Sequence, residues 1–356
     1  MNSAFWNNKS VFLTGHTGFK GGWIALWLSN MGAKVYGYSL AAPTIPNFFT
    51  ETNLSDYLEQ SIIGDIRDKD KLTKVLKEAS PSLGLHMAAQ PLVRESYINP
   101  LETYAINVMG TVNLLEAIRK TESVQAIINI TTDKCYENNE WIWGYRENDR
   151  LGGYDPYSSS KTCSEIVTAA YRNSFFAESG IHVATARAGN VIGGGDWAND
   201  RLIPDLLRAV DGGKVLQIRS PNAIRPWQHV LEPLSGYIML AEALCKKGEP
   251  FAEAWNFGPN EEDAKSVGWV VEKLCKHITG ASWEMDMKKQ PHEAGLLKLD
   301  SSKARANLGW SPRWNLETAL TKTLEWHDAW RNKEDMEKLT SMQISKFLKR
   351  NKNSNK

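Results

Sequence analysis

The chain has 356 residues, of which 42% are hydrophobic and 23% are charged, so it is long enough to bury a large core and to form about two domains. Lys and Arg number 42 against 41 Asp and Glu, and the net charge of +1 gives no indication of binding to nucleic acid or to an anionic membrane surface. This composition excludes a disordered chain, a collagen-like chain and a small disulfide-bonded domain.

The four cysteines form no Cys-x-x-Cys pair and no Cys/His cluster, so neither a disulfide framework nor a metal site is expected. The first residues lack the charged and then apolar pattern of a secretory signal, and no run approaches the roughly 18 apolar residues of a membrane-spanning helix. We therefore expect a cytoplasmic protein with reduced thiols, no bound metal and no membrane partner.

The first 190 residues alternate short apolar runs with helical patterns. The expected strands are Ser10–Gly15, Ala33–Leu40, Ser61–Ile66, Leu83–Ala89, Gln125–Thr132 and His182–Val191. The expected helices lie near 20–31, 68–79, 100–120, 157–179 and 203–212. Strands separated by helices favour parallel crossover connections, so the pattern predicts an α/β fold with a doubly wound parallel sheet covered by helices on both faces.

Beyond Val191 the pattern becomes rich in loops, with helical patterns near 231–246, 265–279 and from about 316 onward, and short strands around 214–218 and 253–257. We predict a first domain over 1–190, to which about 225–250 returns, and a smaller C-terminal α+β region over 191–330. A C-terminal helix and basic tail fill 331–356. The Lys-rich end is interpreted as a solvated, fraying tail, with a basic interaction arm as the alternative.

A glycine-rich turn, Gly15-His16-Thr17-Gly18-Phe19-Lys20-Gly21, follows the first strand and opens the first helix. Glycines let the backbone approach a pyrophosphate closely, and the N-terminus of a helix attracts phosphate. In this context the turn predicts a Rossmann-type domain that binds a dinucleotide, with a purely structural turn as the alternative. The second strand ends in Ser39 rather than in a carboxylate, so NAD is not clearly separated from NADP, and Asp65 is better placed for the adenine edge.

Two sets of polar residues are candidates for catalysis. Tyr157 and Lys161 stand four residues apart in a predicted helix, which places them on one face, and a nearby ammonium favours a phenolate that can act as a base. Thr132, Asp133 and Lys134 follow the fifth strand, at the sheet edge where open α/β sheets bind ligands. The alternatives are an exposed Tyr with a solvated Lys in the first set, and a helix cap or a surface turn in the second.

Together these motifs resemble the extended short-chain dehydrogenase/reductase family, and Thr132-Asp133 resembles the catalytic Thr-Asp pair of its nucleotide-sugar 4,6-dehydratases. The resemblance covers nearly the whole chain and implies a hydro-lyase that uses NAD to convert CDP-glucose to its 4-keto-6-deoxy derivative. The segments that resemble the members acting on CDP-glucose are GHTGFKG at 15–21, HMAAQPLVR at 86–94, TDKCYEN at 132–138, GNVIGGGDWANDRLIPD at 189–205, RPWQHVLEPL at 225–234 and HEAGLLKLDSSKA at 292–304.

The resemblance also implies catalytic roles. Tyr157, helped by Lys161 and Thr132, takes the proton of the sugar 4-hydroxyl, and Asp133 protonates the departing 6-hydroxyl. Many relatives carry Glu after this Asp, whereas this chain carries Lys134. Lys134 is therefore the candidate for the base that removes the C5 proton, provided that burial or a neighbouring cation lowers its pKa, with Glu137 or a water molecule as alternatives.

The binding sets follow from the motifs and the resemblance together. His16 and Lys20 replace small or aliphatic residues of relatives, so both are expected to crowd or hold the pyrophosphate, and Asn107 is expected to brace the Tyr157–Lys161 pair. The expected NAD-binding residues are Gly15, His16, Gly18, Phe19, Lys20, Gly21, Ser39, Asp65, Ile66, Ala88, Asn107, Tyr157 and Lys161. The expected ligands of the substrate are Arg94, Asn190, Arg201, Arg219, Arg225 and His292.

A homodimer or homotetramer is expected, because the helices near 100–120 and 157–179 correspond to those that pair between subunits in this family. The nearest alternative function is a 4-epimerase, or a dehydratase for another nucleotide; an epimerase has no use for a proton donor such as Asp133. A non-enzymatic NAD-sensing scaffold is a further alternative, but it would not need the intact pair of Tyr157 and Lys161.

Overall fold

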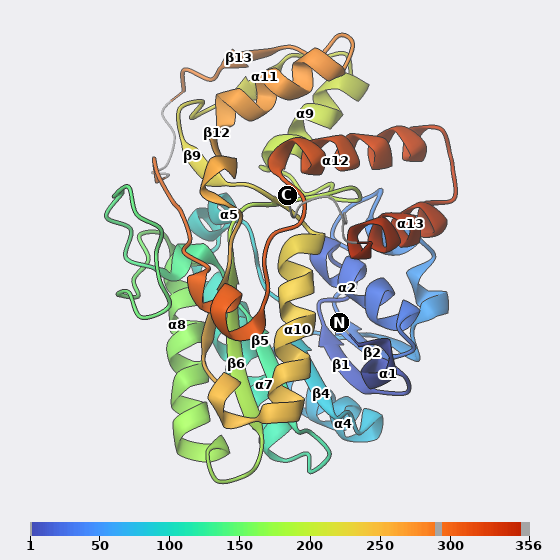
Figure 1. The fold of residues 1–356 in the computed structure, drawn as a ribbon, viewed down its shortest axis with the longest axis vertical. Helices are drawn as coiled ribbons and strands as arrows, with labels where there is room; N and C mark the ends of the chain where they lie inside the picture. Colours follow the sequence, from blue (N-terminus) through green and yellow to red (C-terminus); the bar gives the residue numbers. More distant parts are fainter. Residues whose placement is uncertain (1, 289–293, 350–356) are drawn as a thin grey trace.

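A seven-stranded parallel sheet forms the centre of the computed structural model, which describes residues 2–288 and 294–349 (Figure 1). The strand order is β11-β6-β5-β4-β1-β2-β3, and every neighbouring pair is parallel. The predicted α/β fold with a doubly wound parallel sheet is confirmed. Its strands are β1 (Ser10–Thr14), β2 (Lys34–Ser39), β3 (Gln60–Ile63), β4 (Leu83–His86), β5 (Ala126–Ile130), β6 (His182–Ala188) and β11 (Ala254–Phe257).

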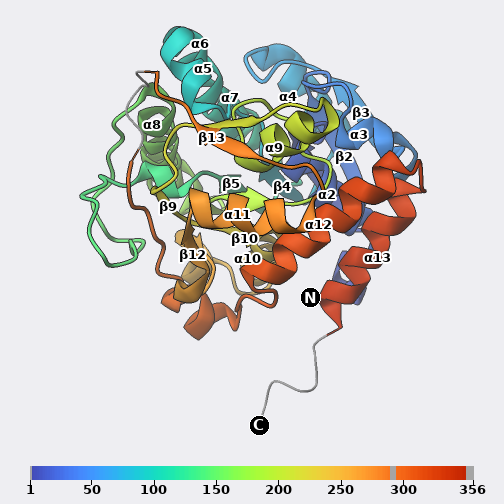
Figure 2. The same cartoon turned by 90° about the horizontal axis from the view of Figure 1, so that it is seen from above.

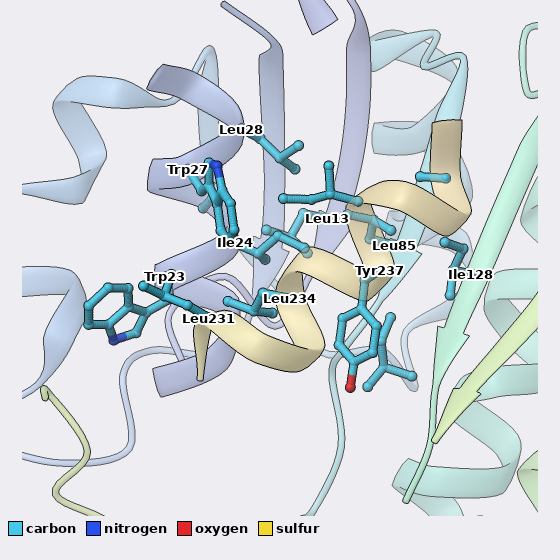
Figure 3. Close-up of a cluster of buried hydrophobic side chains, with 14 of the residues drawn as sticks. Leu13, Trp23, Ile24, Trp27, Leu28, Leu85, Ile128, Leu231, Leu234 and Tyr237 are labelled. Atoms are coloured by element: carbon cyan, nitrogen blue, oxygen red, sulfur yellow. The ribbon is translucent and has the colours of Figure 1, made fainter. Parts of the chain in front are cut away.

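Helices cover both faces of the sheet. Successive side chains of its central strands point in opposite directions, so neighbouring residues of one strand are buried in different clusters. In β1, Val11 and Leu13 pack under α2 (Phe19–Asn30) and α10 (Leu231–Lys247), whereas Phe12 joins the opposite cluster. Figure 3 shows the first cluster, in which side chains of α2 and α10 meet those of β1, β4 and β5. The opposite face is covered by α4 (Lys69–Ala79), α7 (Gly110–Arg119) and α8 (Pro156–Tyr171).

Three predicted elements are broken into shorter ones. The helical pattern near 100–120 becomes α6 (Pro100–Tyr104), a π-helical turn and then α7. Likewise, α8 ends at Tyr171 in a π-helical turn, Arg172–Phe176, rather than continuing to 179. The strand expected over His182–Val191 divides into β6 and β7 (Val191–Ile192), which pairs with β10 (Gln228–His229) instead of joining the central sheet.

The second region lies over one end of the sheet, as the views in Figures 1 and 2 agree. It combines α9 (Leu202–Asp211), α11 (Val267–His277) and α12 (Leu316–Arg331) with small two-stranded sheets, and it has its own apolar core. The chain returns to the central sheet at β11. The remaining strands are β8 (Leu216–Ile218), β9 (Ile224–Pro226), β12 (Ala264–Ser266) and β13 (Trp283–Met285), and the remaining helices are α1 (Ser3–Trp6), α3 (Phe48–Glu51), α5 (Val93–Ile98) and α13 (Met336–Leu348).

Two further observations concern the described residues. None of their helices has the length and apolar character needed to cross a membrane. All four cysteines are free thiols.

Candidate active site

A cavity of about 1250 Å³ opens between the carboxyl ends of the central strands and the second region. The glycine-rich turn and the ends of β2 and β3 line one part of it, and the residues after β5 and the start of α8 line the middle. The segment before α9 and the end of β8 line the other part. This position, at the carboxyl edge of an open α/β sheet, is where such folds bind ligands.

The glycine-rich turn fits a dinucleotide because its backbone is packed too closely for side chains. Gly15 has φ +83°, and a Cβ there would lie 2.8 Å from the backbone nitrogen of Ala88. A Cβ on Gly21 would lie 2.0 Å from the carbonyl oxygen of Gly15. Gly18 precedes the first turn of α2 without a side-chain cap, so the free N–H groups of the helix face the cavity and suit a pyrophosphate.

His16 and Lys20 of this turn point in different directions. The His16 side chain turns away from the cavity: its ring packs under Gly37, and its Nε2 lies 2.8 Å from Ser61 Oγ. The expectation that His16 crowds the pyrophosphate is therefore wrong for its side chain. Lys20 does line the cavity, together with Phe19, and its Nζ donates to the hydroxyl of Tyr237 at 3.1 Å. Burial, followed by the nearby Lys161 and Arg201, lowers the pKa of Lys20 to about 7.

The two polar residues at the ends of β2 and β3 line the cavity but already have partners. The Ser39 hydroxyl lies 2.8 Å from that of Thr17, which donates to the carbonyl of Leu40. The Asp65 carboxylate accepts from the guanidinium of Arg67, at 2.6 Å from Nη2, and this hydrogen bonding lowers its pKa. An adenosine would therefore meet a paired carboxylate and a hydroxyl that is shared with Thr17.

Asn107 does not line the cavity and braces its wall instead. From its π-helical turn it donates to Ser160 Oγ at 2.9 Å and accepts from the backbone of Gln90 at 2.8 Å. Ser160 lies between Tyr157 and Lys161 on α8, so Asn107 contacts the segment that carries the pair and neither member of the pair itself. Ile66 and Ala88 both lie at the cavity surface, as expected.

Tyr157 and Lys161 both lie on α8 and line the cavity, and the Lys161 ammonium makes its hydrogen bond with another element. The ammonium of Lys161 donates to the carbonyl of Ile130 at 3.3 Å, and burial lowers its pKa to about 8. Burial raises the pKa of the Tyr157 phenol to about 12, against the expectation of an easily formed phenolate. A hydrogen bond with Thr132 and the positive charge of Arg201 lower the pKa of Tyr157 and oppose the effect of burial.

Asp133 is the most deeply placed carboxylate of the cavity, with 2% of its surface exposed. Its Oδ1 accepts from the Thr132 hydroxyl at 3.0 Å, whereas its Oδ2 is buried without a hydrogen-bond partner. A Cβ on Gly189 would lie 3.0 Å from this Oδ2, so the oxygen has room only because residue 189 is glycine. Burial raises the pKa of Asp133 above its ordinary value, while Lys134 and Arg225 lower it. The carboxyl is therefore suited to hold a proton and to give it to a bound ligand.

Lys134 and Glu137, the two candidates for the C5 base, both line the cavity. Lys134 is half-buried, and its backbone nitrogen donates to Thr132 Oγ1 at 3.3 Å. Glu137 accepts from Arg150 at 2.7 Å and is thus held in an ion pair. This contact leaves Lys134 the better placed of the two.

A buried ion pair beneath α8 was missed by the sequence analysis. Glu165, one turn after Lys161, accepts from Arg187 on β6 at 2.9 Å through both of its oxygens. It also accepts from Thr131 and Thr185, so it fixes the end of β5, from which Thr132 and Asp133 extend. No local spacing signals this pair, because Glu165 and Arg187 are 22 positions apart and lie on different elements.

The expected substrate ligands that the structure describes all line the cavity: Arg94, Asn190, Arg201, Arg219 and Arg225. Arg201 is paired with Asp196 at 2.8 Å. Arg225 lies close enough to Asp133 to lower its pKa. His292 lies outside the described residues.

The parallel sheet, the glycine-rich turn after β1 and the Tyr157-x-x-x-Lys161 motif on α8 define an extended short-chain dehydrogenase/reductase. The family model for GDP-mannose 4,6-dehydratase matches residues 12–323. The chain belongs to this family.

Individual relatives agree with this assignment. The chain is 55% identical to a CDP-glucose 4,6-dehydratase of Salmonella typhimurium, over 97% of each chain. A dTDP-glucose 4,6-dehydratase of Bacillus anthracis, solved with NAD, superimposes with a TM-score of 0.75 at 22% identity, covering 92% of this chain and 98% of its own. A UDP-glucose 4-epimerase of Thermotoga maritima has a TM-score of 0.77 at 20% identity, covering 90% and 99%, so the fold is shared by dehydratases and epimerases.

Proposed function

We propose that the chain is a hydro-lyase that converts CDP-glucose to CDP-4-keto-6-deoxyglucose, with NAD held at the glycine-rich turn. The observation that carries the proposal is the buried, unpartnered Oδ2 of Asp133 beside Thr132 and Tyr157. A dehydratase needs a proton donor for its leaving hydroxyl at this place, and an epimerase does not. The high identity to a CDP-glucose 4,6-dehydratase supports the choice of reaction and of nucleotide.

The first task of the site is to remove the proton of the sugar 4-hydroxyl. Tyr157 is the base, because it lines the cavity and hydrogen-bonds with Thr132. The glycine-rich turn would hold NAD, whose nicotinamide would supply the acceptor for the C4 hydride and the donor of a hydride to C6. The hydrogen bond with Thr132 and the charge of Arg201 favour the negatively charged phenolate, although burial opposes it. Deprotonation is therefore favoured by a pH above neutral.

The second task is to remove water across C5 and C6. A 4-ketone acidifies the C5 hydrogen, and in this proposal Lys134 takes the C5 proton while Asp133 gives its own proton to the departing 6-hydroxyl; Lys134 returns the proton to C5 when a hydride reaches C6. Burial keeps Asp133 protonated at a higher pH than an ordinary carboxyl, which suits a general acid. Deep burial also limits the access of bulk water during the reaction.

The third task is to hold the nucleotide diphosphate. Arg94, Arg201 and Arg219 approach from three different segments, and their planar guanidinium groups suit phosphate oxygens. Asn190 and Arg225 complete the set of substrate ligands that we propose, and His292 belongs to it by resemblance alone.

The deciding experiment incubates the NAD-loaded protein separately with CDP-, UDP-, GDP- and dTDP-glucose and measures loss of water by mass spectrometry. We expect the product from CDP-glucose. Loss of water from another nucleotide sugar would correct the nucleotide, and no loss from any of the four would refute the dehydratase. Conversion to a product of unchanged mass, resolved by chromatography, would identify an epimerase.

We further propose that the chain forms a homodimer or a tetramer built from dimers, and that it acts in the cytoplasm. Three large apolar side chains, Met109, Ile166 and Phe175, are about half exposed on or next to α7 and α8. A second copy would cover them by packing the same helices against each other. Light scattering of the wild type and of Ile166→Glu tests this, and a wild type of monomer mass at micromolar concentration would refute it.

A further inference from the structure

Asp200 joins two arginines that come from different elements of the cavity wall. Its Oδ1 accepts from Nη1 of Arg94, on α5, at 3.0 Å and lies 3.7 Å from Nη1 of Arg219, which directly follows β8. All three side chains line the cavity and are partly exposed. Asp200 therefore forms an acidic bridge across the part of the cavity that carries the expected ligands of the diphosphate.

The backbone of Asp200 adopts a conformation that is unfavourable for most residues other than glycine. Its φ is +59°, a left-handed conformation that Asp and Asn tolerate better than other non-glycine residues. The neighbouring segment is fixed on both sides, since Asp196 pairs with Arg201 and Leu202 begins α9. The position of the carboxylate is therefore imposed by the fold of this segment.

A carboxylate and a phosphate compete for the same guanidinium groups, because both offer paired anionic oxygens to the same donors. A diphosphate that approaches Arg94 and Arg219 meets a like charge on Asp200, which must leave for both arginines to bind phosphate. Partly exposed ion pairs contribute little free energy, so the substrate can displace Asp200 from the two arginines at a small cost in binding free energy.

We propose that Asp200 is a specificity-determining residue, an internal competitor that occupies Arg94 and Arg219 until the diphosphate of the substrate displaces it. The proposal rests on the proposed function in taking a nucleoside diphosphate sugar as the substrate. A ligand that supplies phosphates to both arginines replaces the two contacts of Asp200, whereas a nucleoside or a sugar without phosphates cannot. Asp200 thus lowers the affinity for ligands that place phosphates at Arg94 and Arg219, and it penalises those that reach only one of the two arginines.

The test compares Asp200→Asn with the wild type, using CDP as the probe in isothermal titration calorimetry. Asn tolerates the same left-handed backbone, so the variant removes the charge and keeps the conformation. We expect CDP to bind about two- to fivefold more tightly, the range of a partly exposed ion pair. The affinity for NAD should stay unchanged, which also shows that the variant is folded. Asp56→Asn, an exposed site outside the cavity, is the matched control for the change in net charge.

A double-mutant cycle identifies the arginine through which Asp200 acts. In an Arg94→Gln background, the gain from Asp200→Asn should shrink, because one competing contact is already absent. Weaker or unchanged CDP binding in Asp200→Asn would overturn the proposal, because Asp200 would then orient the arginines or contact the substrate itself. An equal gain with and without Arg94 would overturn the competition at Arg94.

These measurements are independent of the reaction. If the wild type dehydrates another nucleotide sugar, its nucleoside diphosphate replaces CDP, and the competition is tested in the same way. If CDP-glucose is dehydrated but Asp200→Asn binds CDP no better, only the role of Asp200 is wrong.

Discussion

The two parts of the cavity are built by different means. At the glycine-rich turn the backbone defines the site, because Gly15 and Gly21 pack against main-chain atoms at distances that no side chain allows. Near the second region, charged side chains define it, both within one segment, as in the pair Arg201–Asp196, and between separate segments, as in the pair Arg94–Asp200. The first part depends on close contacts between main-chain atoms, whereas the second depends on ion pairs between side chains.

The largest effect is expected at Asp133, where the two parts meet. Asp133→Asn keeps the shape of the side chain but removes the proton donor, so the rate of water loss should fall by about 10²- to 10⁴-fold. Oxidation at C4 should persist, because Tyr157 and Thr132 are intact. A single-turnover assay that follows nicotinamide absorbance and product mass separates the two steps, and normal turnover would contradict the assigned role.

The next largest effect is a difference in stability between alanine variants of two glycines in the glycine-rich turn. Gly21→Ala places a Cβ 2.0 Å from the Gly15 carbonyl oxygen and should cost about 3 kcal/mol of stability. Gly18→Ala meets its nearest neighbour at 3.4 Å, so it should fold normally and weaken only NAD binding. Urea unfolding and NAD titration of both variants test this, and equal stability of the two would contradict a site defined by the backbone.

A pH effect is expected from Glu232 on α10, which accepts from the backbone nitrogens of Arg313 and Trp314. Burial raises the pKa of this carboxyl to about 8, above its ordinary value of 4.5. The folded state thus binds this proton more tightly than the unfolded state. The resulting contribution to the free energy of unfolding is complete below about pH 4.5 and is lost as the pH rises to about 8. Between pH 6 and 8 the wild type should lose roughly 2 kcal/mol relative to Glu232→Gln. Urea unfolding of the wild type and of Glu232→Gln at pH 6 and at pH 8 measures this loss. An equal change in the free energy of unfolding of the two proteins between these pH values would refute the titration of Glu232.

The smallest effect is expected from Asp196→Asn, which removes the partner of Arg201. The guanidinium loses its fixed orientation, so KM for the nucleotide sugar should rise about two- to fivefold, with stability almost unchanged. Steady-state kinetics at low and high salt measure the effect, which should shrink as salt screens the pair. An unchanged KM at low salt would show that this ion pair does not shape the substrate site.

The sequence predicted the backbone-defined part well, because its signals are local. The apolar runs located the six N-terminal strands, and the spacing of Gly15, Gly18 and Gly21 located the turn. The direction of His16 was not predictable, because it depends on the space above Gly37, on a neighbouring strand.

The part defined by side chains was predicted less well. Arginines were expected at the diphosphate, but their partners Asp196 and Asp200 were not, since Arg94 and Asp200 lie 106 positions apart and no local pattern marks their contact. The same reason explains why Lys161 was expected to pair with Tyr157: spacing places two residues on one face, but the carbonyl of Ile130, on another element, takes the hydrogen bond.

The late return of the chain at β11 has a consequence for biosynthesis. β11 pairs with β6 through Ala254 and Thr185, which are 69 positions apart, so this edge of the sheet has high contact order. During translation the backbone groups along β6 stay uncovered until residue 257 has left the ribosome, and such an open edge invites association with other nascent chains. A chain that ends between β6 and β11 would leave β6 without its partner strand, so aggregation is the expected fate of such an N-terminal fragment expressed alone.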